Sequence, residues 1–348
     1  MISKQVRILN AVDSNLATTD FEIVEVEIPK LQSGEVLVEN SYCSTDPFVR
    51  TTMGSEDTSD VFNTVPNQPI QGDAVGTVIE SKNAELPVGT KLIHKHGWRT
   101  HTVLTGLDFD KRVDDSDYTK VIPDNHKMLD YLSIYGLVGI TAYYSLTKIL
   151  NPNPGDVVVI DGATGGVGQM FIQMAVAKGI DVYGVTSTDE KVDYINSIGG
   201  IGVLLTTPGG LAKVHKVYNA TFLDGIDYYH SNVCSERMLL GLAKLKPRAH
   251  LVLCGAMKTY NRPPFKVLGA NISSITHKDA HIHGCSWRFD IHEWRQEFFD
   301  FVDENYDKLV PKYQIYEGIE SMPQQYVDQF FVYDEDSNKK FGRSVTQL

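Results

Sequence analysis

Residues 157–168, VVVIDGATGGVG, join a short apolar run to a glycine-rich turn. The apolar run is β-branched throughout, as expected for a strand that is covered on both faces. The turn has the spacing GxGxxG, with Ala163 in the first glycine position and Gly165 and Gly168 in the other two. Such a turn lets the backbone approach a pyrophosphate closely, and a helix that follows it directs free N–H groups at the anion. Taken alone, the glycines are also compatible with a tight structural turn.

The segments that flank the turn favour dinucleotide binding. A helix is predicted near residues 166–178, and a second strand follows at residues 181–186. Strand, glycine turn, helix and second strand together form the βαβ unit of a nucleotide-binding fold. We therefore predict that a dinucleotide is bound through the backbone of Gly165, Gly166, Val167 and Gly168.

The end of the second strand bears on the choice between NADH and NADPH. An NAD-preferring site usually places a carboxylate there against the ribose diol, but this strand ends in the uncharged Thr186 and Ser187. Asp189 and Glu190 follow, and the spacing from Ser187 to Glu190 is that of a helix capping box, which gives these acids a structural role. Lys191 could reach a 2′-phosphate, or it could be a solvated helix charge. Together these features favour NADPH over NADH.

Two patterns divide the chain into domains. Up to about residue 122, short runs broken by glycine and proline are typical of a small antiparallel barrel; they are residues 21–28, 35–39, 74–80, 91–94 and 100–104. From about residue 124 onward, strands alternate with longer helices, which predicts a parallel sheet with helices on both faces. Short apolar pieces return near the C-terminus, where the chain is expected to rejoin the first domain. The expected class is α/β.

Composition limits the partners of the chain. A length of 348 residues favours two domains. The net charge of −12 argues against nucleic acid or an anionic membrane as a partner, because both require a basic surface. No apolar stretch is long enough to span a membrane, and the four cysteines are scattered. We expect a soluble, cytoplasmic protein with free thiols and a small-molecule partner.

Several separated motifs coincide with those of a known group. They are STDPFVR at 44–50, GW at 97–98, GLVGITAY at 136–143, the glycine turn, STDEK at 187–191, CGAMKTYN at 254–261 and GRSV at 342–345. In these motifs the chain resembles the zinc-independent medium-chain dehydrogenases/reductases of the leukotriene B4 dehydrogenase, prostaglandin reductase and alkenal double-bond reductase group. The motif at 254–261 is the most specific to this group, and the glycine turn is shared most widely.

The resemblance implies a fold and a division into domains. A GroES-like antiparallel barrel, the catalytic domain, is expected from residues 1–123 and 306–348. A Rossmann domain with a doubly wound parallel sheet is expected from residues 124–305, with the active site in the cleft between the two. The resemblance also implies a homodimer joined through the nucleotide-binding domains.

Further cofactor residues follow partly from the resemblance and partly from the pattern. The resemblance places Thr141, Cys254, Gly255 and Tyr260 at the cofactor. Lys340 is assigned to it as well, although the family usually has an asparagine beside the nicotinamide at this point. Asn232 follows a predicted strand and so lies at the carboxyl end of the sheet, where ligands bind in open α/β folds. A tyrosine that often holds the 2′-phosphate in the family is missing, because LLTT occupies residues 204–207.

The sequence predicts no catalytic metal. Zinc alcohol dehydrogenases need three protein ligands around an open position. Cys43 falls at the first ligand, but Gly72-Asp73-Ala74 replaces the second motif, and no cysteine or histidine lies between residues 130 and 144. Cys43 is therefore interpreted as a buried thiol. The pairs His94/His96 and His281/His283 supply only two ligands each.

Without a Lewis acid, the bond reduced most easily is a carbon–carbon double bond conjugated to a carbonyl. The developing enolate needs hydrogen-bond donors and the α-carbon needs a proton. Tyr260 is the predicted donor, with a ribose hydroxyl relay or a packing role as alternatives. The predicted pocket residues, for which packing or ion-pair roles also stay open, are Tyr42, Phe48, Arg50 and Trp98. Quinone reduction and a non-catalytic nucleotide-binding protein are the alternative functions.

Overall fold

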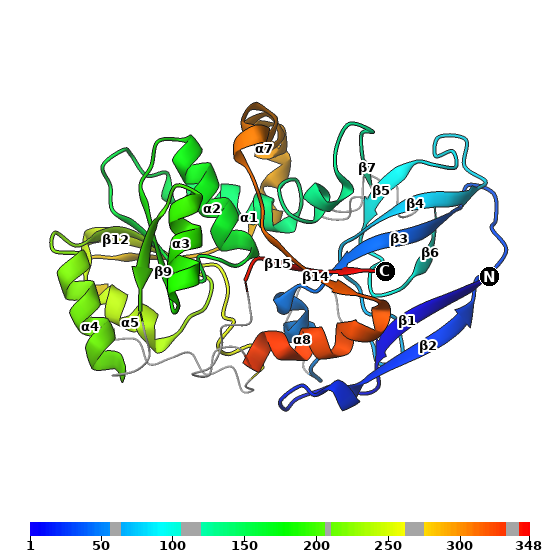
Figure 1. Cartoon of the computed structure of the whole chain (residues 1–348), viewed down its shortest axis with the longest axis horizontal. Helices are drawn as coiled ribbons and strands as arrows, with labels where there is room; N and C mark the ends of the chain where they lie inside the picture. The colour runs from blue at the N-terminus through cyan, green and yellow to red at the C-terminus, as the bar shows by residue number, and fades with distance from the viewer. Residues whose placement is uncertain (56–63, 106–119, 206–209, 262–274, 332–340) are drawn as a thin grey trace. The chain divides into compact units, whose positions relative to one another are not determined.

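The computed structural model describes residues 1–55, 64–105, 120–205, 210–261, 275–331 and 341–348, which fall into two compact units (Figure 1). Unit 1 comprises Met1–Gly136, Tyr313–Phe331 and Ser344–Leu348. Unit 2 comprises Leu137–Lys312 and Val332–Arg343. Among the described residues, no helix has both the length and the apolar character needed to cross a membrane.

In the described residues, unit 2 is built on a six-stranded sheet in which all five neighbouring strand pairs are parallel. Its strands are β8 (Val158–Ile160), β9 (Val182–Thr186), β10 (Ile201–Leu204), β11 (Ile226–Ser231), β12 (Leu245–Leu253) and β13 (His281–Gly284). They lie in the order β10-β9-β8-β11-β12-β13. Counted along the sheet within this unit, that is the order 3-2-1-4-5-6 of a dinucleotide-binding fold, in which the strand order reverses beside β8.

Helices cover both faces of this sheet (Figure 1). Val185 and Val203 belong to a core cluster that includes Tyr218 of α4 and Met238 of α5. On the opposite face, a Cβ added to Gly202 would lie 2.8 Å from Val192 of α3. The described helices of unit 2 are α1 (Leu137–Tyr144), α2 (Gly166–Ala177), α3 (Asp189–Ser197), α4 (Gly210–Thr221), α5 (Glu236–Leu242) and α7 (Ile291–Asn305). A π-helical turn at Ser145–Leu150 extends α1.

His230 is an unusual member of the core of unit 2. It lies on β11, has no exposed surface, and packs against Phe171 of α2 with 4.8 Å between ring centroids. Neither ring nitrogen has a hydrogen-bond partner among the residues that the structure describes. Burial lowers the pKa of His230 to about 3, so the imidazole stays neutral in the folded protein over the ordinary pH range.

Replacing His230 with leucine is expected to make the protein more resistant to acid. The folded-state pKa lies below the ordinary value of 6.5, so the unfolded chain binds the proton first and His230 costs stability as the pH falls from 6.5 towards 3. The difference in unfolding free energy between His230→Leu and wild type should grow by about 1.4 kcal/mol per pH unit below 6.5. Urea unfolding at pH 7, 6, 5 and 4 measures it, and a difference that does not change with pH would contradict a neutral buried imidazole.

Unit 1 contains a seven-stranded sheet and a two-stranded one. The large sheet has the order β14-β15-β3-β4-β5-β7, and β6 also pairs with β3. Its strands are β3 (Val36–Ser44), β4 (Ala74–Ser81), β5 (Lys91–His94), β6 (His101–Leu104), β7 (Lys120–Val121), β14 (Tyr313–Glu317) and β15 (Arg343–Gln347). The small sheet pairs β1 (Ile2–Ile8) with β2 (Phe21–Glu27). α8 (Met322–Phe331) and short 3₁₀ segments, among them Pro47–Thr52 and Met128–Leu132, complete unit 1.

The predicted fold class is confirmed, because an antiparallel sheet and a parallel Rossmann-type sheet occupy separate units. Two details differ from the sequence analysis. The strand β1 was not predicted, and Phe330 and Phe331, which belong to one of the apolar pieces near the C-terminus, end the helix α8. The units also divide differently from the predicted domains, since residues 124–136 fall in unit 1 and residues 306–312 in unit 2. The short strand β7 pairs with β5, so the antiparallel sheet of unit 1 continues to Val121, just before residues 124–136.

Candidate cofactor site and catalytic residue

The glycine turn joins β8 directly to α2. Gly162 has a φ of +59°, a conformation that favours glycine. Gly165 is the N-cap of α2, and its N–H donates to the Gly162 oxygen over 3.0 Å. A Cβ on Gly168 would lie only 2.3 Å from that same oxygen. The helix therefore starts in direct contact with the turn, which requires a glycine at position 168.

The first turn of α2 offers backbone donors to an anion. The first i→i−4 bond runs from the Gln169 N–H to the Gly165 oxygen, at 3.0 Å. The amides of Gly166, Val167 and Gly168 precede it and belong to the set that a helix cannot satisfy internally. A Cβ on Gly165 would have a single neighbour within 4 Å, the Gly162 oxygen at 3.3 Å. This donor-rich helix end fits the pyrophosphate of a dinucleotide.

Asp161 ties the glycine turn to the loop after β11. It is buried, and its Oδ1 accepts hydrogen bonds from the backbone N–H groups of Asn232, at 2.7 Å, and Val233, at 3.0 Å. Its Oδ2 accepts one from the Ser231 hydroxyl at 2.7 Å. The Asn232 side-chain amide donates to the Asp161 backbone oxygen at 2.9 Å. Asn232 thus has a structural bond in addition to its predicted cofactor role.

Tyr260 lies in the segment that follows β12 at the same edge of the sheet. The N–H groups of Cys254 and Gly255 both donate to the Ser231 oxygen, at 2.9 and 3.2 Å. A Cβ on Gly255 would lie 3.5 Å from the Tyr260 hydroxyl and 2.9 Å from the Asn232 oxygen. Burial raises the pKa of Tyr260 to about 12, so its phenol is protonated at neutral pH. The structure therefore brings Asn232, Gly255 and the Tyr260 hydroxyl together.

Lys191 is held close to the end of β9. Thr188, not the predicted Ser187, is the N-cap of α3, and its hydroxyl accepts the Lys191 N–H at 3.4 Å. The predicted capping box with Glu190 is therefore wrong by one residue, because the third helical position is Lys191. The Lys191 side chain is buried, at 8% exposure, and burial lowers its pKa. It is no freely solvated charge, and it forms no ion pair within the described parts of the chain.

The segment after residue 340 packs onto the glycine turn. The Gly342 N–H donates to the Thr164 oxygen at 2.9 Å, and a Cβ on Gly166 would lie 3.1 Å from the side chain of Arg343. Phe341 makes a cation–π contact with Lys312, whose ammonium lies 3.5 Å from the centre of the phenyl ring. Lys340, predicted to contact the cofactor, lies outside the described residues.

Thr141 has two structural partners. Its hydroxyl donates to the Leu137 oxygen within α1 at 2.7 Å and accepts from the Trp287 indole at 3.1 Å. These contacts anchor α1 to the turn that contains Trp287. The predicted cofactor contact of Thr141 stays a prediction.

The predicted pocket residues of unit 1 have different surroundings. Tyr42 and Phe48 are half-buried. Trp98 has no exposed surface and packs edge-on against Tyr326 at 5.0 Å, which supports the alternative of core packing. Arg50 is buried at 1% exposure and donates to the Ser14 oxygen at 2.6 Å, so this arginine has a structural partner.

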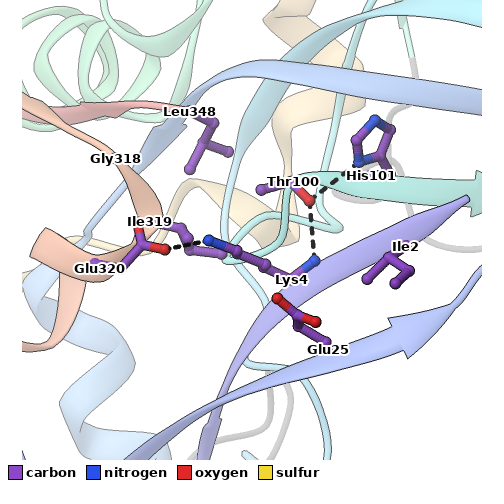
Figure 2. Close-up of a pocket in the computed structure, with 9 residues that line it drawn as sticks. All are labelled: Ile2, Lys4, Glu25, Thr100, His101, Gly318, Ile319, Glu320 and Leu348. Atoms are coloured by element: carbon purple, nitrogen blue, oxygen red, sulfur yellow. Dashed lines mark hydrogen bonds and ion pairs between the residues drawn. The ribbon is translucent and has the colours of Figure 1, made fainter.

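A surface cavity of about 360 Å³ lies in unit 1, and none of these four residues lines it (Figure 2). Lys4 crosses it and pairs with Glu320 at 2.5 Å, while Glu25 and His101 line its sides. The Lys4 and Glu320 side chains are 42% and 60% exposed, so the pair is solvated. The predicted site residues are all absent from the cavity lining.

Family models match both parts of the chain. Residues 4–111 match the model described as the N-terminal domain of oxidoreductase, and residues 166–304 match the model described as zinc-binding dehydrogenase. Prostaglandin reductase 1 of Oryctolagus cuniculus is 30% identical over 310 residues, covering 88% of this chain and 83% of the rabbit protein. The chain belongs to the zinc-independent prostaglandin and alkenal reductase group of the medium-chain dehydrogenases/reductases.

A further relative and a solved structure agree with this chain in length and fold. The NADP(+)-dependent 2-alkenal reductase of Nicotiana tabacum is 28% identical over 354 residues, covering 99% of this chain and 97% of the tobacco protein. The crystal structure of CurA in complex with NADPH from Vibrio vulnificus has a TM-score of 0.85 and covers 99% of both chains at 23% identity, which shows a shared fold.

The candidate zinc ligands of this reductase, Cys43 and His94, have other partners. Cys43 is fully buried, its sulfur accepts the Trp98 N–H at 3.0 Å, and burial raises its pKa to about 12. A Cβ on Gly97 would lie 2.7 Å from the same sulfur. His94 bonds Asn40 through Nε2 at 2.9 Å and accepts the His96 N–H through Nδ1. In the part of the chain that the structure describes, no three His, Cys, Asp or Glu side chains are arranged to hold a metal ion.

Several residues that shape the reductase site were not predicted from the sequence. Asp161 and Ser231 organise the strand ends, and Lys312, Phe341 and Arg343 hold the last segment of unit 2. Asp161 could have been found, because an acid directly after a buried strand must have partners. Lys312 and Arg343 carry no such local signal, since their contacts come from distant parts of the chain.

Proposed function

We propose that the protein uses NADPH to reduce the carbon–carbon double bond of α,β-unsaturated carbonyl compounds. The observation that carries the proposal is a protonated phenol, Tyr260, at the sheet edge where the glycine turn offers backbone amides. The kinship with prostaglandin reductase 1 and with an NADP(+)-dependent 2-alkenal reductase supports it. The substrate class follows from the same kinship and from the chemistry of a donor facing a developing enolate.

The residues present fit a nicotinamide dinucleotide. Gly165, Gly166, Val167 and Gly168 would hold the pyrophosphate, Thr186, Ser187 and Lys191 the phosphorylated ribose, and Asn232, Cys254, Gly255 and Tyr260 the nicotinamide end. When bound, NADPH supplies the hydride for the β-carbon of the substrate. The chain contributes binding and orientation through these backbone amides, and Gly255 lies directly against Asn232 at the nicotinamide end.

Tyr260 would hold the carbonyl oxygen and supply a proton. A phenol with a pKa of about 12 stays protonated at neutral pH and donates a hydrogen bond most strongly when the oxygen gains negative charge. Burial is the largest cause of this raised pKa. The same hydroxyl is then placed to transfer its proton as the double bond becomes saturated.

Replacing Tyr260 with phenylalanine is expected to lower kcat by about 100-fold on a 2-alkenal, since one acid–base group contributes on this order. Binding of NADPH, measured by fluorescence titration, should change little, because the variant keeps the ring and its packing. Tyr228→Phe, on β11, serves as the matched control. Unchanged turnover in Tyr260→Phe would remove this residue from the mechanism.

Replacing Lys191 with methionine is expected to reduce NADPH affinity by about 10- to 100-fold and leave NADH affinity nearly unchanged. A charge-assisted bond to a 2′-phosphate is worth about 1.5–3 kcal/mol, and only NADPH carries that group. Titration with both reduced nucleotides measures the ratio, and Lys216→Met on the exposed face of α4 is the control. Equal losses for the two nucleotides would contradict this role.

Loss of NADPH absorbance on addition of a 2-alkenal tests the function directly. With NADPH deuterated at C4, the saturated aldehyde should carry one deuterium on the β-carbon, as mass spectrometry and NMR can establish. Consumption with quinones alone would replace the proposal by quinone reduction. Tight NADPH binding without turnover on either class would indicate a non-catalytic nucleotide-binding protein.

We also propose a cytoplasmic homodimer with a catalytic domain of residues 1–123 and 306–348 and a nucleotide-binding domain of residues 124–305. The four free cysteines support a reducing compartment. Light scattering on the purified protein tests the dimer. Limited proteolysis, followed by identification of the stable fragments, tests the boundaries.

A further inference from the structure

Two thiols meet where β12 and β13 end. The strands are parallel neighbours, and their last paired residues are Leu253 and Gly284. Cys254 and Cys285 come next on the two strands, so the same register places them side by side. Partners across neighbouring strands are separated by about 5 Å, which falls within the Cα separation that a disulfide spans.

The two thiols also interact. The hydrogen bond with the Cys285 thiol is the largest cause that raises the pKa of Cys254 well above its ordinary value, and burial adds to it. Both residues are free cysteines and half-buried, and Cys285 is flanked by the exposed Gly284 and Ser286. An oxidant from solvent can therefore reach Cys285 first, with Cys254 already beside it.

We propose that Cys254 and Cys285 form a reversible intrachain disulfide on exposure to a peroxide, and that this bond lowers turnover by displacing the segment that carries Tyr260. The loss of turnover rests on the proposed function, whereas disulfide formation does not. The pair is thus a redox-sensitive modification site at the edge of the nucleotide-binding sheet.

The chemistry balances with hydrogen peroxide as the oxidant. The Cys285 thiolate attacks one peroxide oxygen, the O–O bond breaks, and hydroxide leaves as water after protonation, which gives a sulfenic acid. The Cys254 sulfur then attacks the Cys285 sulfur, the S–O bond breaks, and a second water leaves. Two thiols are oxidised to one disulfide, and one hydrogen peroxide is reduced to two waters.

The link to Tyr260 is short and made of backbone. Cys254 and Gly255 are both hydrogen-bonded to the Ser231 oxygen, and Gly255 packs against the Tyr260 hydroxyl. Drawing Cys254 towards β13 strains these two bonds, because a disulfide imposes its own Cβ separation and dihedral angle. A displacement of about 1 Å at a catalytic group is enough to reduce turnover by 10-fold or more.

The other two cysteines are less suited to the reaction. Cys43 is fully buried in unit 1. Cys234 follows β11, which pairs with β8 and β12 and not with β13, so the strand register does not place it beside Cys285. Cys234 is the only other cysteine of unit 2 and is therefore the competing partner to be excluded by experiment.

The purified full-length protein, treated with a small excess of hydrogen peroxide, should lose two mass units and yield a peptide that links Cys254 to Cys285 without reductant. Dithiothreitol should restore both the mass and the turnover, which falls by about 10-fold on oxidation. Cys285→Ser should keep its basal turnover and lose the linkage, while Cys234→Ser should behave as wild type. A linkage through Cys234, or no loss of two mass units, would overturn the proposal. Formation of the linkage with no measurable turnover in either state would instead count against the proposed function.

Discussion

Alanine at position 168 is expected to abolish NADPH binding and to destabilise unit 2. The new Cβ would lie 2.3 Å from the Gly162 oxygen and 2.7 Å from the Ala163 Cα and carbonyl carbon, distances that intact side chains do not adopt. All three atoms belong to the backbone of the turn, so no side chain can move aside. Either α2 shifts away from the turn or the turn itself opens, and both changes displace the amides aimed at the pyrophosphate.

The expected size of the effect is at least 100-fold in NADPH affinity and about 3 kcal/mol in unfolding free energy, the upper end for overpacking. Isothermal titration and urea unfolding measure the two quantities. Gly165→Ala is the informative comparison, because its φ of −76° suits alanine and its Cβ has one neighbour within 4 Å, at 3.3 Å. It should keep its stability and lose affinity only through contact with the ligand. Normal NADPH affinity in Gly168→Ala would exclude this turn as the phosphate site.

The nucleotide-binding unit was predictable because its decisive signals are local. A β-branched run, a glycine turn and a helix within residues 157–178 correspond to β8, the turn and α2, and the alternation that follows gave the parallel sheet. The strand β1 was missed because Ser3, Lys4 and Gln5 make it look polar, although it is held by pairing with β2. The N-cap of α3 was misplaced because Ser187 and Thr188 are both good caps, and only the fold selects between them.

The parts of the site that depend on contacts between distant residues could not be predicted from local sequence patterns. Arg343 lies against Gly166, and Lys312 lies over Phe341. The members of each pair are distant in the sequence, and no motif connects them. Trp98 was predicted as a pocket residue, with core packing as the alternative. Its burial against Tyr326 depends on α8, more than two hundred residues away in the chain.

Replacing Asp161 with alanine is expected to cost about 3 kcal/mol of unfolding free energy at neutral pH and to weaken NADPH binding. The buried N–H groups of Asn232 and Val233 and the Ser231 hydroxyl would lose their acceptor, and buried donors without a partner cost about 1–3 kcal/mol each. The loop after β11 would then no longer be fixed beside Gly162. Asp161→Asn keeps the shape and one acceptor oxygen, so it should fall between wild type and alanine in urea unfolding.

The same residue should shape the acid response of unit 2 together with His230. Burial raises the pKa of Asp161 from 3.8 to about 6, so the folded protein binds this proton more readily than the unfolded chain. The stabilisation that arises from this raised pKa is therefore fully present below pH 3.8 and is lost as the pH rises through 6. His230, whose pKa is lowered to about 3, contributes in the opposite sense over the overlapping range. Between about pH 4 and 6 the two slopes, each about 1.4 kcal/mol per pH unit, should largely cancel.

Removing one member of this pair should expose the slope of the other. Relative to wild type, Asp161→Asn should lose stability more steeply as the pH falls from 6 to 4, because His230 is then uncompensated. His230→Leu should gain stability as the pH falls over the same interval, because the opposite slope of Asp161 is then uncompensated. The double variant should return to the pH dependence of wild type in this range, although not to its absolute stability. Parallel stability curves for wild type and Asp161→Asn between pH 4 and 6 would mean that this carboxylate titrates alike in the folded and unfolded chains, and that its burial is not what sets its pKa.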